Sequence, residues 1–287
     1  MYFLAFEDGA GYIGQAVDVV RRFSQHVANH GDIRAMSFRR VRRDALSAEE
    51  RRCIWAAESA NVRLRNIAHM SVITGETDLD LVVSPAAQSR WEASGVQPRG
   101  KASRPTDSAL RKRYEKKYER MIGCEGAEET VSLLRRYREI GLLAPAQTEL
   151  SFWAVSCLPV IRRGKFLLFA RVNVNWQEVL TIGIDESGMF ASVHLSESVL
   201  RGDLGAKWLT DLRRTVRDVD SYDHKYRPGG IDQVQLVASS YRGIRRLLEV
   251  SPVVASIRHF NLNLMRKGGT PSSKFHCFSL ADEMYRR

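Results

Sequence analysis

An arginine and a histidine stand four residues apart, at positions 22 and 26, in the stretch GYIGQAVDVVRRFSQH. Asp18 is a typical N-cap residue and predicts a helix from about Val19 to Val27. Residues four apart lie on one side of a helix, so Arg22 and His26 would face the same way. Arg22 can donate two parallel hydrogen bonds to phosphate oxygens. His26 can contact the same phosphate or transfer a proton, so the pair indicates chemistry on a phosphate group.

Glu50 carries a carboxylate, a hard oxygen ligand that suits a metal ion such as Mg²⁺. It lies on a helix predicted from about Ala48 to Ala60. A single carboxylate suits one Mg²⁺ that keeps several waters, whereas two-metal sites need several converging carboxylates. Ser47 and Glu50 also match a capping box, so the spacing could be purely local. Glu58 lies two turns further on, where we expect it to face solvent.

A small antiparallel sheet must position these side chains. The first two strands form a hairpin around the turn EDGAG, and the third strand follows the helix that carries Arg22. Gly14 suits a place where the backbone turns tightly or approaches another group closely. We expect the helix to bury a stripe made of Val19, Phe23 and Val27. The predicted strands cover residues 2–6, 12–16 and 36–41.

The order and spacing of these residues resemble the GIY-YIG nuclease family. YFLAF stands where the family has its first tyrosine strand, and the YIG motif is intact at Tyr12–Gly14. Met1 precedes Tyr2, so the glycine of the first motif has no counterpart. The segment EERRCIWAAESANVRLRNI resembles the family's glutamate helix and the asparagine beyond it. The residues that match the family's catalytic positions are Tyr2, Tyr12, Arg22, His26, Glu50 and Asn66.

The resemblance implies a metal-dependent endonuclease that hydrolyses DNA phosphodiester bonds. By that likeness Tyr2 orients or deprotonates the attacking water, and Tyr12 supports it. Glu50 would hold one Mg²⁺, for which Mn²⁺ can substitute, and Arg22 would clamp the phosphate. A tyrosine with an ordinary pKa near 10 needs nearby cations to act as a base, and Arg22 and the metal would supply them.

Other interpretations stay open. Tyr2 and Tyr12 could be ordinary strand aromatics, His26 a surface histidine, and Asn66 a residue that only holds its loop near Glu50. The domain could bind DNA without cutting it. It could also cut RNA or branched DNA. One active site cuts one strand, so duplex cleavage would need a homodimer on DNA or a second binding event.

The charge of the chain favours a polyanionic partner. Its 44 basic and 33 acidic residues give a formal net charge of +11. Duplex DNA is the partner we expect. Arginines along and after the third strand could follow a DNA backbone, or they could discourage strand pairing at a sheet edge. The predicted DNA-contacting residues are Arg21, Arg39, Arg40, Arg42, Arg43, Arg111, Lys112 and Arg113.

The chain as a whole predicts an α+β protein with three regions. Residues 1–84 form the nuclease-like domain, 85–148 a basic linker and helical connector, and 149–287 an α+β targeting or DNA-binding domain with an antiparallel sheet. In the last region we expect strands over 150–160, 165–174, 179–185, 189–195, 256–264 and 274–280, and helices over 206–219 and 239–250.

The composition also excludes several classes of protein. The sequence contains no run of eighteen apolar residues, so we expect no membrane span. The N-terminus has no basic region and no cleavage site, so we expect no signal peptide. A cytoplasmic location is the resulting expectation. The four cysteines form no zinc-binding spacing and are expected to be reduced thiols.

Overall fold

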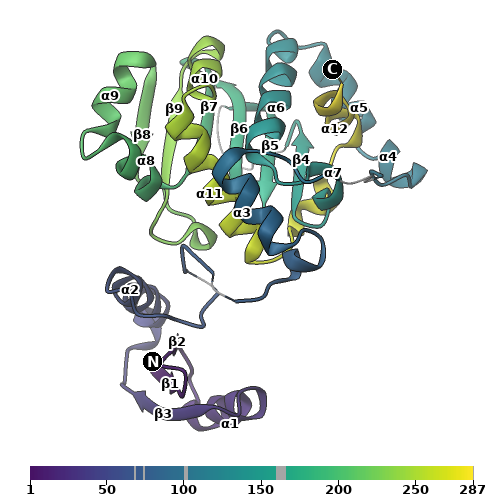
Figure 1. The fold of residues 1–287 in the computed structure, drawn as a ribbon. Helices are drawn as coiled ribbons and strands as arrows, with labels where there is room; N and C mark the ends of the chain where they lie inside the picture. The colour runs from purple at the N-terminus through teal and green to yellow at the C-terminus, as the bar shows by residue number, and fades with distance from the viewer. Residues whose placement is uncertain (68, 74, 100–102, 160–165, 287) are drawn as a thin grey trace. The chain divides into compact units, whose positions relative to one another are not determined.

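The computed structural model describes the chain except for residues 68, 74, 100–102, 160–165 and 287. The chain is α+β and divides into two compact units, Met1–Gly75 and Glu76–Arg287. Each unit has its own antiparallel sheet (Figure 1). Across the described residues, no helix is both long and apolar enough to span a bilayer.

The sheet of the N-terminal unit has the order β2-β1-β3 and is antiparallel throughout. Strand β1 covers Tyr2–Phe6 and β2 covers Gly11–Gly14, as the predicted hairpin requires. Strand β3 covers Ile33–Phe38, so the prediction of 36–41 was three residues too late. Phe38 pairs with Tyr2, the first residue of β1, and the Arg39 amide donates to the Met1 carbonyl at 2.9 Å, where the chain of the neighbouring strand begins. The arginines from Arg39 onward therefore follow the strand.

Helix α1 covers Val19–Asn29 and packs beside this sheet. The predicted cap is confirmed, because Asp18 accepts a hydrogen bond from the Arg21 amide at 3.0 Å. Val19 and Phe23 are half-buried against the apolar residues of β1, but Val27 is 49% exposed. The prediction of Val27 as a core residue was wrong, since the helix turns His26 inward instead.

Helix α2 covers Leu46–Ser59, two residues earlier at its start than predicted. The short 3₁₀ turn η1, Arg43–Ala45, leads directly into it, so Ser47 lies inside the helix. No side-chain hydrogen bond caps this helix, and the predicted capping box is absent. Glu58 is half-buried rather than solvated, since its Oε1 accepts a hydrogen bond from the Ser71 amide at 2.7 Å.

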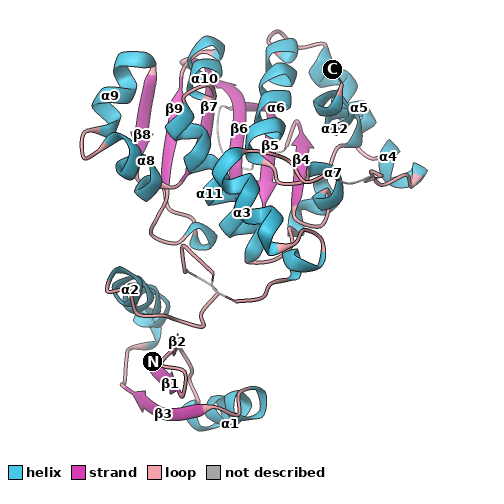
Figure 2. Cartoon of the chain, in the orientation of Figure 1, coloured by secondary structure: helices cyan, strands magenta, loops and turns pink. Residues whose placement is uncertain are grey.

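The C-terminal unit is built on a six-stranded antiparallel sheet of order β4-β5-β6-β7-β9-β8. Helices α6, α10 and α11 cover one face of it (Figure 2). The strands are β4 Trp153–Cys157, β5 Leu167–Val174, β6 Gln177–Asp185, β7 Gly188–Leu195, β8 Val219–Tyr222 and β9 Val234–Ala238. The helices are α3 Pro85–Ser94, α4 Ser108–Lys112, α5 Glu115–Ile122, α6 Ala127–Gly141, α7 Pro145–Thr148, α8 Glu197–Leu204, α9 Trp208–Thr215, α10 Tyr241–Leu247, α11 Ser251–Arg266 and α12 Phe278–Tyr285. The 3₁₀ turns η2 Asp78–Leu81, η3 Arg227–Gly229 and η4 Pro271–Phe275 complete the set.

The region 85–148 is part of this unit and not a separate connector. Trp91 of α3, Met121 of α5 and Tyr137 of α6 are all fully buried in the same apolar core as the sheet. The compact unit therefore begins at Glu76. The polar composition of 85–106 misled the linker prediction, because one buried tryptophan is enough to dock α3.

Two predicted strands of the C-terminal unit are helices. Residues 256–264 lie within α11, and most of 274–280 belongs to η4 and α12. The alternation in IRHFNLNL suggested a strand, but Val253, Ile257, Phe260 and Leu264 recur at helical spacing and are buried. The predicted strand ends at 160 and 165 lie outside the described residues, and β8 and β9 were not predicted.

Candidate active site in the N-terminal unit

The hydroxyl of Tyr2, on β1, forms hydrogen bonds with two side chains of α1. It lies 2.7 Å from Nε2 of His26, and it accepts a hydrogen bond from Nε of Arg22 at 3.3 Å. Tyr2 is 2% exposed and His26 is 7% exposed, whereas Arg22 is exposed. The guanidinium therefore joins a buried phenol and imidazole to the protein surface. The structure thus brings together three of the predicted catalytic side chains.

Tyr12 and Gly14 complete this cluster from β2. The Tyr12 ring lies 6.2 Å from the Tyr2 ring, nearly parallel to it, and 4.9 Å from the His26 ring. Gly14 pairs with Tyr2 across the sheet, and a Cβ at Gly14 would overlap the end of the Tyr2 ring. A side chain at this position would displace the phenol, so the close approach predicted for Gly14 is confirmed.

Burial decides the protonation of the cluster. Burial raises the pKa of Tyr2, and the hydrogen bond from Arg22 opposes this only in part. The expected lowering of the tyrosine pKa by Arg22 is therefore outweighed. Burial also lowers the pKa of His26, with the charge of Arg22 acting in the same direction. A neutral His26 can accept the Tyr2 proton at Nε2 while Arg22 donates to the same oxygen.

Glu50 is tied to β2 through Gln15, a residue that the sequence analysis missed. The Gln15 amide donates to Oε2 of Glu50 at 3.0 Å and to the Ser47 hydroxyl at 3.2 Å. The Glu50 carboxylate also contributes to the raised pKa of Tyr2. Gln15 directly follows the YIG motif, and this adjacency was the signal that the sequence offered.

Asn66 holds the backbone of β2 in place. Its Oδ1 accepts from the Ile13 amide at 2.9 Å, and its Nδ2 donates to the Ile13 carbonyl at 2.7 Å. Asn66 is 7% exposed, and the chain before it runs beside β2, with Gly11 bonded to the backbone of Arg63 and Arg65. Both ends of the amide are occupied, so Asn66 positions the segment between Tyr12 and Gly14 rather than contacting a substrate.

Glu50 is the predicted ligand of a metal ion. The described residues contain no group of three or more His, Cys, Asp or Glu side chains arranged to hold a metal. Glu50 supplies one carboxylate next to the Ser47 hydroxyl, and the Gln15 amide N–H groups hold both of them. Mg²⁺ binds through few protein ligands and retains waters, so one carboxylate is enough to hold it. Glu50 is therefore the residue that could hold one Mg²⁺, as predicted from the sequence.

The predicted DNA-contacting arginines of this unit are all exposed. Arg39 pairs with Glu49, and Arg42 pairs with Asp44 at 2.7 Å. Arg39, Arg40 and Arg43 line a groove of about 530 Å³ that reaches the start of α1. Neither the pairs nor the groove identifies a ligand, but the groove places three cations beside the helix that carries Arg22. The fifth residue of this set is Arg21, on α1.

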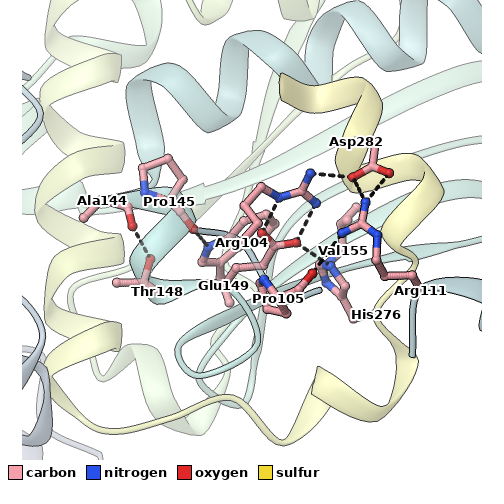
Figure 3. Close-up of polar contacts among 11 residues, drawn as sticks. Arg104, Pro105, Arg111, Ala144, Pro145, Thr148, Glu149, Val155, His276 and Asp282 are labelled. Atoms are coloured by element: carbon pink, nitrogen blue, oxygen red, sulfur yellow. Dashed lines mark hydrogen bonds and ion pairs between the residues drawn. The ribbon is translucent and has the colours of Figure 1, made fainter. Parts of the chain in front are cut away.

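The basic residues of α4 differ from this pattern. Arg111 donates from Nη2 to both carboxylate oxygens of Asp282, at 2.6 and 2.7 Å, and from Nη1 to the Pro105 carbonyl (Figure 3). The Arg111 guanidinium is thus used within the fold, and its role as a DNA contact stays a prediction. Arg113 lies near the Lys274 carbonyl, at 3.5 Å, and Lys112 is exposed.

A buried ion network lies next to Arg111 in Figure 3. Glu149 has a fully buried side chain that accepts two bonds from Arg104, at 2.6 and 2.8 Å, and one from His276 at 2.9 Å. Arg104 also pairs with Asp282. Burial alone would raise the pKa of Glu149, but the hydrogen bonds from Arg104 and His276 hold it below its ordinary value. The network ties the segment before α4 to β4 and α12, which is a structural role.

Comparisons with known proteins add no relative. No family model matches the chain, and neither the curated proteins nor the solved structures give a match. The resemblance to GIY-YIG nucleases therefore stays a prediction drawn from the motif residues.

Proposed function

We propose that the N-terminal unit is a metal-dependent endonuclease of the GIY-YIG type that hydrolyses DNA phosphodiester bonds. The observation that carries the proposal is the junction at the Tyr2 hydroxyl, where His26 and Arg22 meet one oxygen atom. A buried phenol bonded to a neutral imidazole and to a surface-reaching cation is suited to proton transfer beside a phosphate.

The proposed mechanism begins with the phosphate. Arg22 uses Nε on Tyr2 and Nη1 on Gln25, at 3.1 Å, so its exposed remaining N–H groups can bind phosphate oxygens. The water that attacks phosphorus gives its proton to the Tyr2 oxygen as the phenol passes its own proton to Nε2 of His26. This relay needs a neutral imidazole at the start, which burial of His26 favours. The phenol remains neutral throughout. As the P–O bond breaks, the leaving oxygen takes a proton from solvent water, and the protonated His26 then releases its proton to solvent.

Glu50, with Gln15 and Ser47 beside it, would hold the Mg²⁺ ion. When bound, the ion supplies a positive charge that stabilises the leaving oxygen. Asn66 acts indirectly, by fixing the strand that carries Tyr12 and Gly14. The C-terminal unit would select the target, and duplex cleavage would proceed through a homodimer or through two successive nicks.

The test is nicking of supercoiled plasmid with Mg²⁺ or Mn²⁺ against EDTA, using the wild type and the E50Q and E49Q variants. E50Q removes the metal-binding charge but keeps an acceptor for Gln15, and cleavage should fall to the EDTA level. E49Q removes a neighbouring charge on the same helix that pairs with Arg39 and Arg52, and cleavage should persist.

Equal cleavage by the wild type and E50Q would refute the proposal. DNA binding without metal-dependent cleavage would instead show a DNA-binding module. Substrates of single-stranded DNA, RNA, flaps and junctions, assayed in parallel, separate the alternative nucleases from one that acts on duplex DNA.

A further inference from the structure

The C-terminal unit carries a cavity of about 460 Å³ on the sheet face opposite α6, α10 and α11. Ala170, Val172 and Val174 of β5 belong to the apolar core under those helices. Arg171 and Asn173 alternate with them and line the cavity instead. The volume lies in the range of small-molecule sites, roughly 300–1,000 Å³. This sheet face is therefore polar and hollowed where the other is apolar and covered.

The floor of the cavity is a fixed polar arrangement. Arg171 pairs with Oε1 of Glu178 at 2.6 Å, and the Tyr226 hydroxyl donates to Oε2 at 3.2 Å. Burial, assisted by Glu178, raises the pKa of Tyr226 to about 12, so this hydroxyl stays protonated. The carboxylate is thus held in one orientation, with lone pairs left for a further donor.

Asn173 adds an unused amide to this floor. Its residue is only 9% exposed, and its side chain makes no hydrogen bond within the part of the chain that the structure describes. Because this side chain lines the cavity, its amide donor and its carbonyl acceptor can meet a polar ligand there. The Asn173 side chain thus offers an N–H donor and a carbonyl acceptor, and the neighbouring Glu178 carboxylate offers a second acceptor.

Aromatic side chains form the walls. Trp176 is 71% exposed in the turn between β5 and β6, and Phe275 is 51% exposed at the end of η4. Neither ring contributes to the core, so their exposure has no packing explanation. Two lysines lie at this side of the molecule: Lys117 lines the cavity and Lys274 lies 5.1 Å from the Phe275 ring. Flat aromatic surfaces beside cations are typical of sites that stack bases near a phosphate backbone.

We infer that this cavity binds a nucleobase of a nucleotide unit, with the ring stacked on Trp176 and its polar edge against Asn173 and Glu178. A base edge presents adjacent donors and acceptors, which the amide and the carboxylate complement. Arg171 is already neutralised by Glu178, so the floor does not suit a bare anion. The phosphate would lie toward Lys117. The inference does not depend on cleavage by the N-terminal unit.

The test measures binding of a fluorescein-labelled single-stranded oligonucleotide of about 12 nucleotides by anisotropy. Full-length protein carrying E50Q is used in EDTA, so that cleavage cannot interfere. W176A should weaken binding at least about fivefold, the lower end expected for loss of one stacked base. N173L should weaken it as well. Y222A removes an aromatic residue that is 52% exposed on β8 and does not line the cavity, and it should bind like the parent protein.

Competition by deoxynucleoside monophosphates identifies the source of the base. Displacement by monophosphates as strong as displacement by an unlabelled strand indicates a free nucleotide, and weak displacement indicates a base within a strand. Equal affinities of W176A and Y222A, or no binding of strand or monophosphate, would overturn the inference. Trp176 is at a hairpin tip outside the core, so W176A keeps the test valid even if N173L does not fold.

Discussion

Gly14 and Tyr2 pair across the small sheet with almost no space between them. A Cβ at Gly14 would meet Cζ of Tyr2 at 2.5 Å and would approach the hydroxyl still more closely. The Tyr2 ring cannot turn away without losing its bonds to His26 and Arg22. We therefore expect Gly14→Ala to destabilise the N-terminal unit by about 1–3 kcal/mol, the usual cost of overpacking.

The same geometry predicts a coupling between these two positions. Tyr2→Phe removes the hydroxyl and leaves Nε2 of His26 buried without that partner, which should cost about 1–3 kcal/mol by itself. In the double variant, the atom that the new Cβ would meet most closely is gone. The combined loss should therefore be smaller than the sum of the single losses by about 1 kcal/mol.

Hydrogen exchange at increasing urea concentration, followed by mass spectrometry on peptides of β1, β2 and α1, measures this in the full-length chain. It reports the N-terminal unit separately from the C-terminal unit, whose unfolding need not coincide. Gly31→Ala is the matched control, since a Cβ there meets no atom within 4 Å. Strict additivity of Gly14→Ala and Tyr2→Phe, or an effect of Gly31→Ala as large as that of Gly14→Ala, would refute the packing described here.

Three further predictions follow from the protonation states and buried bonds. Because burial lowers the pKa of His26, the plasmid-nicking rate should rise with pH through a midpoint below 6.5 and then level off. His26→Gln should abolish this rise at acidic pH, and a wild-type midpoint at or above 6.5 would contradict the neutral imidazole. Asn66→Ala leaves the amide and carbonyl of Ile13 buried without partners and should cost about 2–4 kcal/mol in the same exchange experiment, while a loss under about 0.5 kcal/mol would contradict the clamp. The pKa of Glu149 is lowered on folding. Its contribution to stability is therefore present above its unfolded pKa near 4.3 and is lost as the pH falls through its folded pKa. In urea unfolding between pH 3 and 7, Glu149→Gln should flatten this pH dependence of stability, and an unchanged dependence would show that Arg104 does not hold the carboxylate ionised.

The sequence predicts much of the N-terminal unit because its signals are local. The hairpin follows from two short apolar strands around a glycine turn, and α1 follows from the Asp18 cap. The inward turn of His26 was not predictable, because helical spacing ranks Val27 as the core residue. Only the position of the Tyr2 hydroxyl makes burial of an imidazole favourable there.

The C-terminal unit shows where local reasoning fails. The alternation in α11 imitates a strand, and only burial against the sheet shows the helical repeat of Val253, Ile257 and Leu264. The ion pair of Arg111 with Asp282 joins residues 171 positions apart, so no spacing could indicate that this guanidinium was occupied. A basic helix is a sign of nucleic-acid binding only when its charges have no partner within the fold.

The arrangement around Tyr2 argues against a purely structural role for these residues. Apolar residues at the positions of Tyr2, His26 and Arg22 could pack without burying a phenol and an imidazole. Replacing buried polar groups with apolar ones of similar shape is often neutral or stabilising. Instead, the absence of a side chain at Gly14 leaves room for the phenol, and both polar atoms of the Asn66 amide bond to the backbone of the neighbouring strand. Several independent positions thus position one hydroxyl group, which lies beside the exposed Arg22. Local choices that favour a single polar junction over better packing are expected at sites of chemistry, so the Tyr2 hydroxyl is the atom on which the proposed nuclease depends.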